Sequence, residues 1–332
     1  MTGHAGPRAH RGARLLADIG GTNARFAWQE AIGEPLRDAA TLPTQEHATL
    51  ASAIRHYLAG AGIATPRWCA IGIATAVTGD RVQMTNHAWS FSTSALQAEL
   101  GFARLLVLND FTAMALALPE LQPHELRQVG GAAAVADAAM ALIGPGTGLG
   151  VSGLLPSGVP GGWVPLQGEG GHVSLTAATS REAAVLEQLR RRFGHPSAER
   201  AVSGAGLEAL HEALSRLDGC DDSSPLPAAE ITERALDATD ASCIETLALF
   251  CAFLGSVAGN LALTLGARGG VYIGGGIVPR LGEAFARSPF RARFEEKGRF
   301  RDYLAAIPVY VIDTPVSPAL RGAARALGAG PS

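Results

Sequence analysis

Short apolar runs interrupted by glycine-rich turns occur twice along the chain in the same order. Residues 14–19 form one apolar run, which Gly20-Gly21-Thr22-Asn23 separates from a second run at 24–28. Residues 140–143 likewise lead through a glycine-rich stretch, 144–150, into residues 151–155. Each segment predicts two strands around a tight turn. The repeat suggests two related α/β halves, although Gly-Thr turns are common enough in α/β proteins for the repeat to be accidental.

Other segments alternate between predicted strands and predicted helices. Apolar runs predict strands at 70–74, 105–108, 270–273 and 308–312. Helical patterns occur at 111–118, 181–193, 206–217, 229–238, 241–267 and 319–327. This alternation predicts a mainly parallel or mixed sheet with helices on both faces.

The length and composition fit a soluble globular protein. A chain of 332 residues can form two domains with a core each, and 47% hydrophobic and 17% charged residues are ordinary values. Residues 246–267 carry no charge and are long enough to span a bilayer. Because this stretch contains Ser256, Asn260 and Thr264 and lacks a one-sided basic flank, we expect a buried helix and no membrane contact.

Charge and lysine content exclude several functional classes. A net charge of −3 provides no basic surface for non-specific nucleic-acid binding. Lys297 is the single lysine and follows no glycine loop, which argues against P-loop enzymes, protein kinases and Schiff-base enzymes. The cysteines are scattered without metal-site spacing and predict a reducing cytoplasm: Cys69, Cys220, Cys243 and Cys251.

The two glycine-threonine turns could bind phosphate without a lysine. Glycine lets successive N–H groups point into one concavity, and threonine adds a hydroxyl donor. Residues 148–153 also match the G-x-G-x-x-G pattern, but a strand and a loop follow instead of a helix, so we reject a dinucleotide site. Asp18, beside the first turn, could bind Mg²⁺ or simply cap the N–H groups of the turn.

Further polar residues stand at predicted strand ends and in loops. Asp110 begins a predicted helix, where it could be an N-cap or a general base for a substrate hydroxyl, and Asn109 beside it suits a sugar hydroxyl. Glu169 and His172 share a glycine-rich loop and could bind neighbouring sugar hydroxyls, whereas a zinc site lacks an evident third ligand. Glu199 could instead form a surface ion pair with Arg200 or Arg191, and residues 85–89 could be a sugar platform or a plain loop.

These residues belong to motifs that follow one another in a recognisable order. The motifs are Ala17-Asp18-Ile19-Gly20-Gly21-Thr22-Asn23-Ala24-Arg25, Met84-Thr85-Asn86-His87, Leu108-Asn109-Asp110-Phe111-Thr112-Ala113, residues 144–150, 168–172 and 197–200, and Tyr272 to Arg280. From about Leu15 to Leu327, the chain closely resembles the bacterial glucokinase family. Ala76, where such enzymes often carry proline, and 13 extra leading residues are the departures.

The resemblance implies an α/β fold of two actin-like ATPase (ribonuclease H-like) domains with an active-site cleft between them. The expected divisions are a flexible tail at 1–13, a small α/β domain at 14–125 plus 314–332, and a large α/β domain at 126–313. The small domain would be discontinuous because the C-terminal helix returns to it in this family. Gly255 and Gly259 permit close helix packing within the chain, and a homodimer is left open.

The resemblance also implies a reaction and a set of site residues. ATP, with Mg²⁺, would phosphorylate the 6-hydroxyl of D-glucose, giving glucose 6-phosphate and ADP, with Asp110 as the general base. Glucose would contact Asn109, Asp110, Glu169, His172 and Glu199. The first phosphate loop would be Ala17, Asp18, Ile19, Gly20, Gly21 and Thr22, with Asp18 as the metal ligand. The second would be Gly146, Thr147 and Gly148, and the adenosine would lie along Gly274, Gly275 and Gly276.

Two alternatives are kept open. One is a hexose kinase of broader specificity, and the other is an actin-like ATPase that has no sugar substrate. The polar set formed by Asn109, Glu169, His172 and Glu199 argues against the second, since such an ATPase does not need it. A related repressor and sugar-kinase group carries a cysteine cluster after its Gly-His loop, which this chain lacks, and no helix-turn-helix pattern predicts DNA binding.

Overall fold

Each predicted strand–turn–strand segment forms a β-hairpin at the centre of a larger sheet. The computed structural model describes residues 12–220 and 225–328 and divides into two units, each with its own sheet. Unit 1 comprises the described residues up to Leu121 and from Thr314 onward, and unit 2 runs from Gln122 to Asp313. Most of the predicted flexible tail, residues 1–11, lies outside the described residues, whereas Ala13 is buried.

The sheet of unit 1 has the strand order β3-β2-β1-β4-β7. Its strands are β1 Arg14–Ile19, β2 Asn23–Gln29, β3 Arg37–Pro43, β4 Trp68–Ile73 and β7 Arg104–Asn109. β1 pairs antiparallel with β2 and parallel with β4, which in turn is parallel to β7. A separate hairpin joins β5 Arg81–Gln83 to β6 Ser90–Ser92.

The sheet of unit 2 has the strand order β11-β10-β9-β12-β13-β8. Its strands are β8 Leu126–Gln128, β9 Met140–Pro145, β10 Leu149–Pro156, β11 Trp163–Pro165, β12 Val271–Ile273 and β13 Val309–Ile312. β9, β10 and β11 form an antiparallel meander, and β9, β12 and β13 are parallel. The antiparallel strand β8 adds an edge to this sheet.

The two sheets therefore share one five-strand topology. In each, three meandering strands are followed by two strands that lie parallel to the first. The predicted mixed α/β fold is confirmed, and the repeated glycine turn corresponds to the same position in both sheets.

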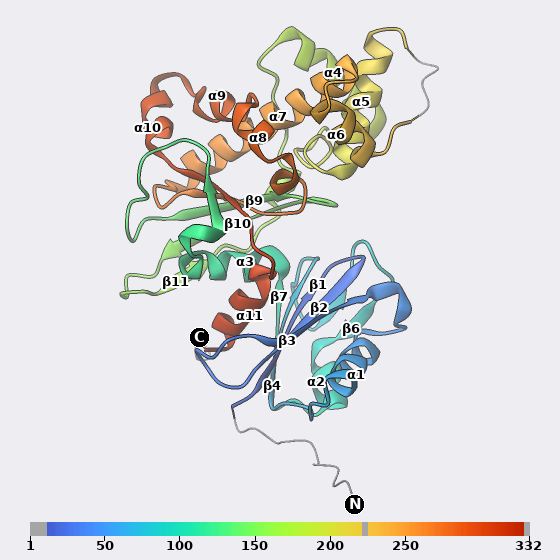
Figure 1. The fold of residues 1–332 in the computed structure, drawn as a ribbon, viewed down its shortest axis with the longest axis vertical. Coiled ribbons are helices and arrows are strands. Elements are labelled where there is room, and N and C mark those ends of the chain that lie inside the picture. The colour runs from blue at the N-terminus through green and yellow to red at the C-terminus, as the bar shows by residue number, and fades with distance from the viewer. Residues whose placement is uncertain (1–11, 221–224, 329–332) are drawn as a thin grey trace, which may run out of the picture. The chain divides into compact units, whose positions relative to one another are not determined.

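Four α-helices lie in unit 1 among the described residues. They are α1 Leu50–Ala61, α2 Thr93–Leu100, α3 Asp110–Ala117 and α11 Pro318–Gly328, with short 3₁₀ turns at η1 Thr44–Glu46 and η2 Leu118–Glu120. The last helix, α11, packs on α3 and β4 although it lies far from them in sequence (Figure 1). Gly322 makes this approach possible, because a Cβ there would overlap the carbonyl of Ala113.

The described part of unit 2 is richer in helices. They are α4 Ser180–Phe193, α5 Gly204–Leu217, α6 Ala228–Leu236, α7 Ala241–Leu265, α8 Glu283–Arg287, α9 Phe290–Glu295 and α10 Arg301–Ala306. The 3₁₀ turns are η3 Pro123–Glu125, η4 Gly170–His172, η5 Val278–Leu281 and η6 Gly298–Phe300. The helices predicted at 181–193, 206–217, 229–238 and 241–267 are confirmed with small shifts of their ends.

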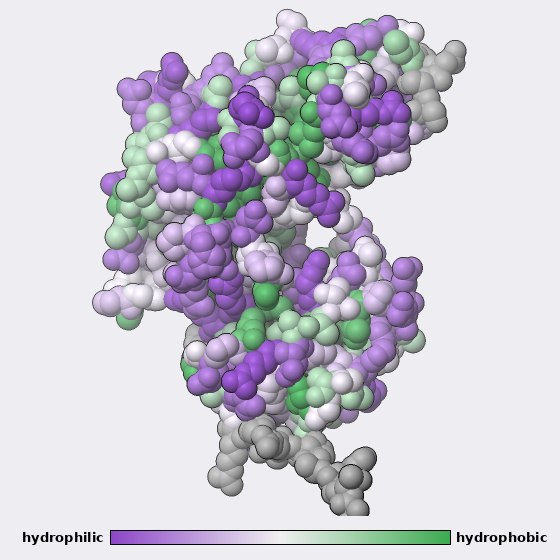
Figure 2. All heavy atoms as spheres, viewed as in Figure 1, coloured by the Kyte–Doolittle hydropathy of each residue, from purple (hydrophilic) through white to green (hydrophobic). Residues whose placement is uncertain are grey.

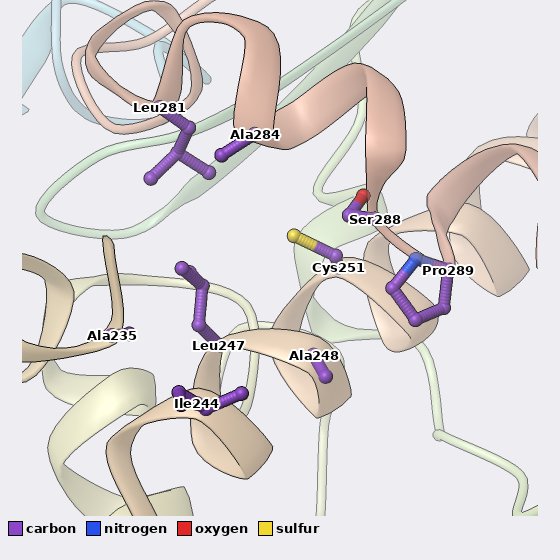
Figure 3. A pocket seen from close by; sticks show the side chains of 9 residues that line it. All are labelled: Ala235, Ile244, Leu247, Ala248, Cys251, Leu281, Ala284, Ser288 and Pro289. Atoms are coloured by element: carbon purple, nitrogen blue, oxygen red, sulfur yellow. The ribbon is translucent and has the colours of Figure 1, made fainter. Parts of the chain in front are cut away.

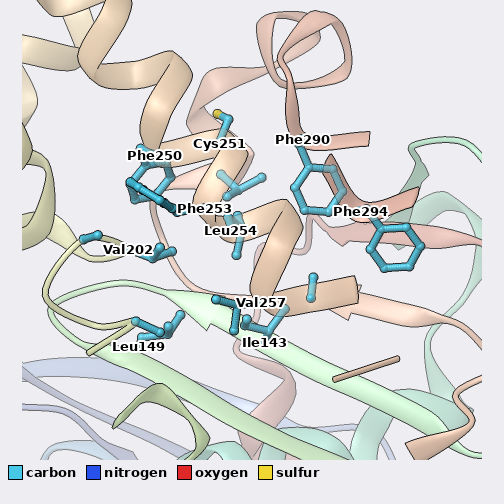
Figure 4. Packing of buried hydrophobic residues seen from close by; sticks show 14 of the residues in the cluster. Ile143, Leu149, Val202, Phe250, Cys251, Phe253, Leu254, Val257, Phe290 and Phe294 are labelled. Atoms are coloured by element: carbon cyan, nitrogen blue, oxygen red, sulfur yellow. The ribbon is translucent and has the colours of Figure 1, made fainter. Parts of the chain in front are cut away.

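The long helix α7 forms the centre of the unit 2 core. Val257 of α7 points toward Ile143 of β9, and Phe290 and Phe294 of α9 pack on another side of the helix (Figure 4). A Cβ on Gly255 or Gly259 would press into the backbone of α9. The close packing predicted from these glycines is therefore present within the chain.

By length and composition, α7 could cross a membrane, but its surroundings are those of a core helix. Within its most apolar window, 67% of the residues are buried inside the protein. On the face shown in Figure 2, hydrophilic residues cover most of the surface, and hydrophobic residues form small separate patches. The expectation of a buried helix over this charge-free stretch is confirmed.

Candidate functional site

The first glycine turn, in unit 1, is backed by a buried carboxylate. Asp18 and Arg25 are cross-strand partners in the β1–β2 hairpin, and Arg25 Nη1 lies 3.3 Å from Asp18 Oδ2. Asp18 is 8% exposed. The Thr44 hydroxyl donates to the carbonyl of Gly21 at 2.8 Å, and a Cβ on Gly21 would approach Asn86 to within 3.1 Å. The turn is thus held from two sides, and the Asp18 side chain contacts Arg25.

The Asp18 carboxylate has the chemistry that a magnesium ion requires. Mg²⁺ prefers oxygen ligands and usually keeps several waters while it binds one or two carboxylates and substrate phosphates. Among residues 12–220 and 225–328, no three His, Cys, Asp or Glu side chains are grouped as metal ligands. A single carboxylate therefore fits a metal that arrives with a nucleotide better than a metal bound by protein side chains alone.

The second glycine turn, in unit 2, presents an open backbone face. The N–H of Gly146 donates to the carbonyl of Gly148 at 2.8 Å, and the carbonyl of Gly146 accepts from Gly204 N–H at 2.9 Å. A Cβ added to Gly146 would meet no atom within 4 Å. Thr147 at the tip is exposed. This combination lets a ligand approach the backbone closely, as phosphate binding requires.

A third glycine turn packs directly against the second. Gly275 has a φ of +78°, and a Cβ there would overlap the carbonyl of Pro145, so only glycine fits at this position. The N–H of Gly274 donates to Ile143 at 2.9 Å, whereas a Cβ on Gly276 would meet open space. The segments predicted to bind adenosine and phosphate are therefore neighbours within unit 2.

Asp110 stands where β7 ends and α3 begins. Asn109 is the N-cap, since its Oδ1 accepts from the N–H groups of Phe111 and Thr112 at 3.0 and 3.1 Å. The alternative in which Asp110 caps the helix is therefore wrong. Asp110 occupies the first helical position, where Oδ1 accepts from Asn109 Nδ2 at 3.0 Å and from Phe111 N–H at 2.9 Å. Both donors hold the carboxylate in one orientation.

The amide of Asn109 is occupied by contacts within unit 1. Its oxygen accepts two backbone N–H groups, and its nitrogen donates to Asp110 and to the carbonyl of Thr75 at 3.3 Å. These four bonds use the full capacity of an asparagine side chain. A sugar hydroxyl that binds Asn109 has to replace one of them, and the Thr75 bond is the longest.

Glu169 and His172 project from a short loop in unit 2. The loop forms the 3₁₀ turn η4, and both side chains are exposed. Gly171 in the same turn is buried, and a Cβ there would overlap the carbonyl of Leu149. This glycine brings the Glu169–His172 loop into direct contact with the strand that follows the second glycine turn.

Glu199 does not form the surface ion pair considered from the sequence. Arg191 pairs with Glu187 at 3.0 Å, and the Arg200 guanidinium lies over the ring of Phe193 at 4.5 Å. Glu199 is half-buried, and its Oε2 accepts from the N–H of Leu149 at 2.9 Å. A local charge pattern suggested the ion pair, but the folded chain directs this carboxylate to the second glycine turn.

Among residues 85–89, Trp89 belongs to the core of unit 1, whereas Thr85, Asn86 and Ala88 are exposed. Trp89 is buried, and its indole N–H donates to the carbonyl of His47 at 2.9 Å. His87 packs edge-on against the same ring at 4.8 Å. Because the indole is enclosed, it cannot serve as a flat surface for a sugar ring.

Three residues that contact the candidate site residues were not predicted from the sequence. They are Arg25 beside Asp18, Thr75 beside Asn109, and Ser203 beside Glu199. Arg25 could have been found, because a hairpin with a four-residue turn pairs it with Asp18. Thr75 and Ser203 contact residues 34 and 4 positions away, and neither lies in a pattern that predicts the contact.

A small apolar pocket lies elsewhere in unit 2, among α6, α7, η5 and α8. It measures about 130 Å³, and Cys251 points into it between Leu247 and Leu281 (Figure 3). Burial raises the pKa of the Cys251 thiol to about 12, so this group is a neutral thiol near neutral pH. None of the predicted site residues lines this pocket, and its apolar walls suit neither a phosphate nor a sugar.

Comparison with known proteins decides the family. The glucokinase family model matches residues 15–329, which is nearly the whole chain. The chain belongs to the glucokinase family. The family predicted from the ordered motifs is thus confirmed.

Individual glucokinases are similar over almost their full length. A glucokinase of Aromatoleum aromaticum is 58% identical over 95% of this chain and 94% of its own. A glucokinase of Chromobacterium violaceum is 56% identical over 94% of this chain and 88% of its own. Among solved structures, a glucokinase from an Antarctic psychrotroph is 36% identical and superposes with a TM-score of 0.84, covering 95% of this chain and 98% of that one.

Proposed function

We propose that this member of the glucokinase family transfers the γ-phosphoryl group of ATP to the 6-hydroxyl of D-glucose, with Asp110 as the general base. The similarity to glucokinases over nearly the whole chain supports the reaction. The placement of Asp110 supports its role, because Oδ1 is held by two donors at the start of α3. The partial positive charge of a helix N-terminus favours an ionised carboxylate there.

The glycine turns provide the nucleotide side of the proposed site. The ATP phosphates would contact the backbone of Gly20–Thr22 in unit 1 and of Gly146–Gly148 in unit 2, and the adenosine would lie along Gly274–Gly276. Asp18 would hold Mg²⁺, which neutralises charge on the β and γ phosphates. In the proposed actin-like fold, residues of both units serve the same two substrates.

Polar side chains provide the sugar side. Glu169 and His172 are exposed and able to accept or donate hydrogen bonds, and Glu199 has one carboxylate oxygen beyond the one bound to Leu149. Asn109 would contribute its amide at the expense of the long Thr75 bond. A site that pairs each substrate hydroxyl can reject an analogue lacking one by roughly 10⁴–10⁵-fold.

The proposed chemical step is an in-line transfer. The proton of the 6-hydroxyl moves to the Asp110 carboxylate as the sugar oxygen forms its bond to the γ-phosphorus, and the bond to the β,γ-bridging oxygen breaks to release ADP. Such transfers depend mainly on positioning and charge stabilisation. The two donors on Asp110 Oδ1 contribute positioning, since they fix the orientation of the carboxylate at the start of α3.

The test is Asp110→Asn in a coupled assay of glucose 6-phosphate formation. We expect kcat to fall by roughly 10²–10⁴-fold, because a general base contributes that much, while the glucose Kd and the thermal unfolding midpoint stay close to wild type. Glu99→Gln removes an exposed carboxylate of the same unit and should change nothing. Wild-type turnover in Asp110→Asn would refute the assignment, and equal efficiency with mannose, fructose and N-acetylglucosamine would favour a broader hexose kinase.

A further inference from the structure

We propose that Ser203 is a positioning residue that couples glucose binding to the second glycine turn through Glu199. The inference rests on the proposed function, in which Glu199 contacts glucose and residues 146–148 contact phosphate. All the contacts that carry it lie within unit 2, between the Glu169–His172 loop, the second glycine turn and residues 199–204, which we term the linking segment.

Glu199 joins three parts of the chain through its three polar groups. Its backbone N–H donates to the carbonyl of Gly171 in the Glu169–His172 loop at 2.8 Å. Its side-chain Oε2 accepts from the N–H of Leu149, directly after the second glycine turn, at 2.9 Å. Its carbonyl accepts from the hydroxyl of Ser203 at 2.8 Å. A change in the position of Glu199 would therefore displace both the Glu169–His172 loop and the second glycine turn.

Ser203 fixes the other end of the linking segment. The residue is 2% exposed, and besides donating to Glu199 its hydroxyl accepts from the N–H of Gly206 at 3.0 Å, which caps α5. The next residue, Gly204, donates its N–H to the carbonyl of Gly146 at 2.9 Å. One buried hydroxyl thus connects the backbone of Glu199 to a helix end that is itself bonded to the second glycine turn.

Steric contacts leave little room for these parts to move separately. A Cβ on Gly148 would overlap Oε2 of Glu199, and a Cβ on Gly171 would overlap the carbonyl of Leu149. Packed groups without free space move together or change partners in discrete steps. A sugar that pulls on Glu199 would consequently shift the N–H of Leu149 and the turn before it, and phosphate on the turn would act on Glu199 in return. Such reciprocity is required of any coupling between two binding sites.

A purely structural role for Ser203 makes a different prediction. If the hydroxyl served only as a helix cap, its loss would resemble the loss of any other cap in the unit. Thr179 provides the matched case, because it caps α4 by accepting from Glu182 N–H at 3.1 Å. Among residues 12–220 and 225–328, its hydroxyl forms no hydrogen bond with the Glu169–His172 loop, the linking segment or the glycine turns. Either cap removal is expected to reduce stability to a similar extent.

The experiment measures how much saturating glucose tightens the binding of AMP-PNP, by titration calorimetry on the full chain with Mg²⁺. The coupling factor is the ratio of the AMP-PNP dissociation constants without and with glucose, and such factors are typically about 5–150. We expect Ser203→Ala to reduce it at least about threefold. Thr179→Ala should keep the wild-type factor, and Ser203→Thr, which retains a hydroxyl, should restore it.

The possible outcomes separate the coupling from the proposed function. A wild-type coupling factor in Ser203→Ala, or an equal loss in Thr179→Ala, would overturn the role of Ser203 while leaving the kinase assignment intact. A wild type that binds no glucose would overturn the proposed function and this coupling with it. Should Ser203→Ala fail to fold, Ser203→Gly gives the same test, since glycine is tolerated at an N-cap at a cost of only a few tenths of a kcal/mol.

Discussion

The two central hairpins have the same place in their sheets but differ in the side chains next to their turns. In unit 1 the strand pair one step before the turn is Asp18 and Arg25, an acid and a base facing each other. In unit 2 the equivalent pair is Gly144 and Gly150, which carry no side chains at all. The carboxylate near the second turn comes instead from Glu199, 50 positions from the residue it contacts.

One sheet topology thus carries its charged groups in two different ways. The first hairpin carries its own charged group, which suits a local metal ligand. The second hairpin has no side chains at the Gly144–Gly150 pair, and the linking segment brings the carboxylate of Glu199, which would bind the sugar in the proposed function, to the turn. In the proposed function, the first turn would respond to the metal and the second to the sugar.

Replacement of Asp18 in the first hairpin should have the largest effect on the reaction rate. We expect Asp18→Asn to lower kcat by roughly 100-fold or more and to raise the Mg²⁺ concentration needed for half-maximal rate, since a metal contributes several kcal/mol to phosphoryl transfer. The glucose Kd should not change. Initial rates across a Mg²⁺ titration at saturating ATP and glucose test this, with Asp80→Asn, a surface carboxylate bound to Ser92, as control.

An unchanged Mg²⁺ dependence in Asp18→Asn would show that the first hairpin does not hold the metal. The two hairpins would then differ only in that the first contains the Asp18–Arg25 ion pair. That pair would stabilise the hairpin without taking part in metal binding.

Alanine substitution of one glycine in each turn should have the next largest effect, and the two variants should differ in their affinity for glucose. In Gly148→Ala the new Cβ would overlap Oε2 of Glu199, so we expect kcat/KM for glucose to fall by about 100-fold, as misplacement of a positioning group by 1 Å can cause. In Gly21→Ala the neighbour is Asn86 at 3.1 Å, and Glu199 is untouched. Glucose Kd values, measured without nucleotide, should therefore rise in Gly148→Ala and stay at the wild-type value in Gly21→Ala.

Equal glucose affinity in the two variants would contradict this expectation. It would mean that Glu199 finds a productive orientation without its bond to Leu149 N–H, and the second turn would then be as independent of the sugar as the first.

The smallest expected effect concerns the helical layer that supports the second hairpin. Glu182 of α4 is 3% exposed and pairs with Arg293 of α9, whose Nη2 also donates to Ser256 of α7 at 3.0 Å. Burial opposes ionisation of Glu182, but the bonds from Arg293 and from Ala178 N–H outweigh it, and the pKa lies below its ordinary value. Glu182→Gln should lower the free energy of unfolding by about 3 kcal/mol at neutral pH, because it removes the buried partner of Arg293 and leaves that cation only its ion pair with the exposed Glu296 at 3.2 Å.

The pH dependence of this contribution has a definite sign. Because the folded pKa is lowered, the unfolded chain binds more protons, so the stabilisation is complete above the ordinary glutamate pKa of 4.5 and is lost as the pH falls through the lowered value. Urea unfolding from pH 7 to pH 3 tests this, with Glu99→Gln as a control. If the free energy of unfolding of Glu182→Gln changed with pH as it does in the wild type, Glu182 would be excluded as the source of this pH dependence.

Local patterns in the sequence predicted most of the regular elements. Both hairpins, the parallel strands β4, β7, β12 and β13, and the helices α3 to α7 were expected close to their observed positions. The helix α1 was missed although Thr49 caps its start and Gly62 ends it with a φ of +66°. The short strands β5, β6, β8 and β11 were also missed, because three residues are too few for an apolar alternation to be detected.

The sequence by itself determined the family, the two strand–turn–strand segments and the set of polar residues at their ends, because periodicity, turn chemistry and motif order are properties of neighbouring residues. Only the tertiary structure decided that Asn109, not Asp110, caps α3, that Glu199 binds Leu149 N–H, and that a buried Ser203 supports it. Contacts between distant residues depend on how strands and helices pack, and packing is decided by shape and buried hydrogen bonds that no local pattern contains.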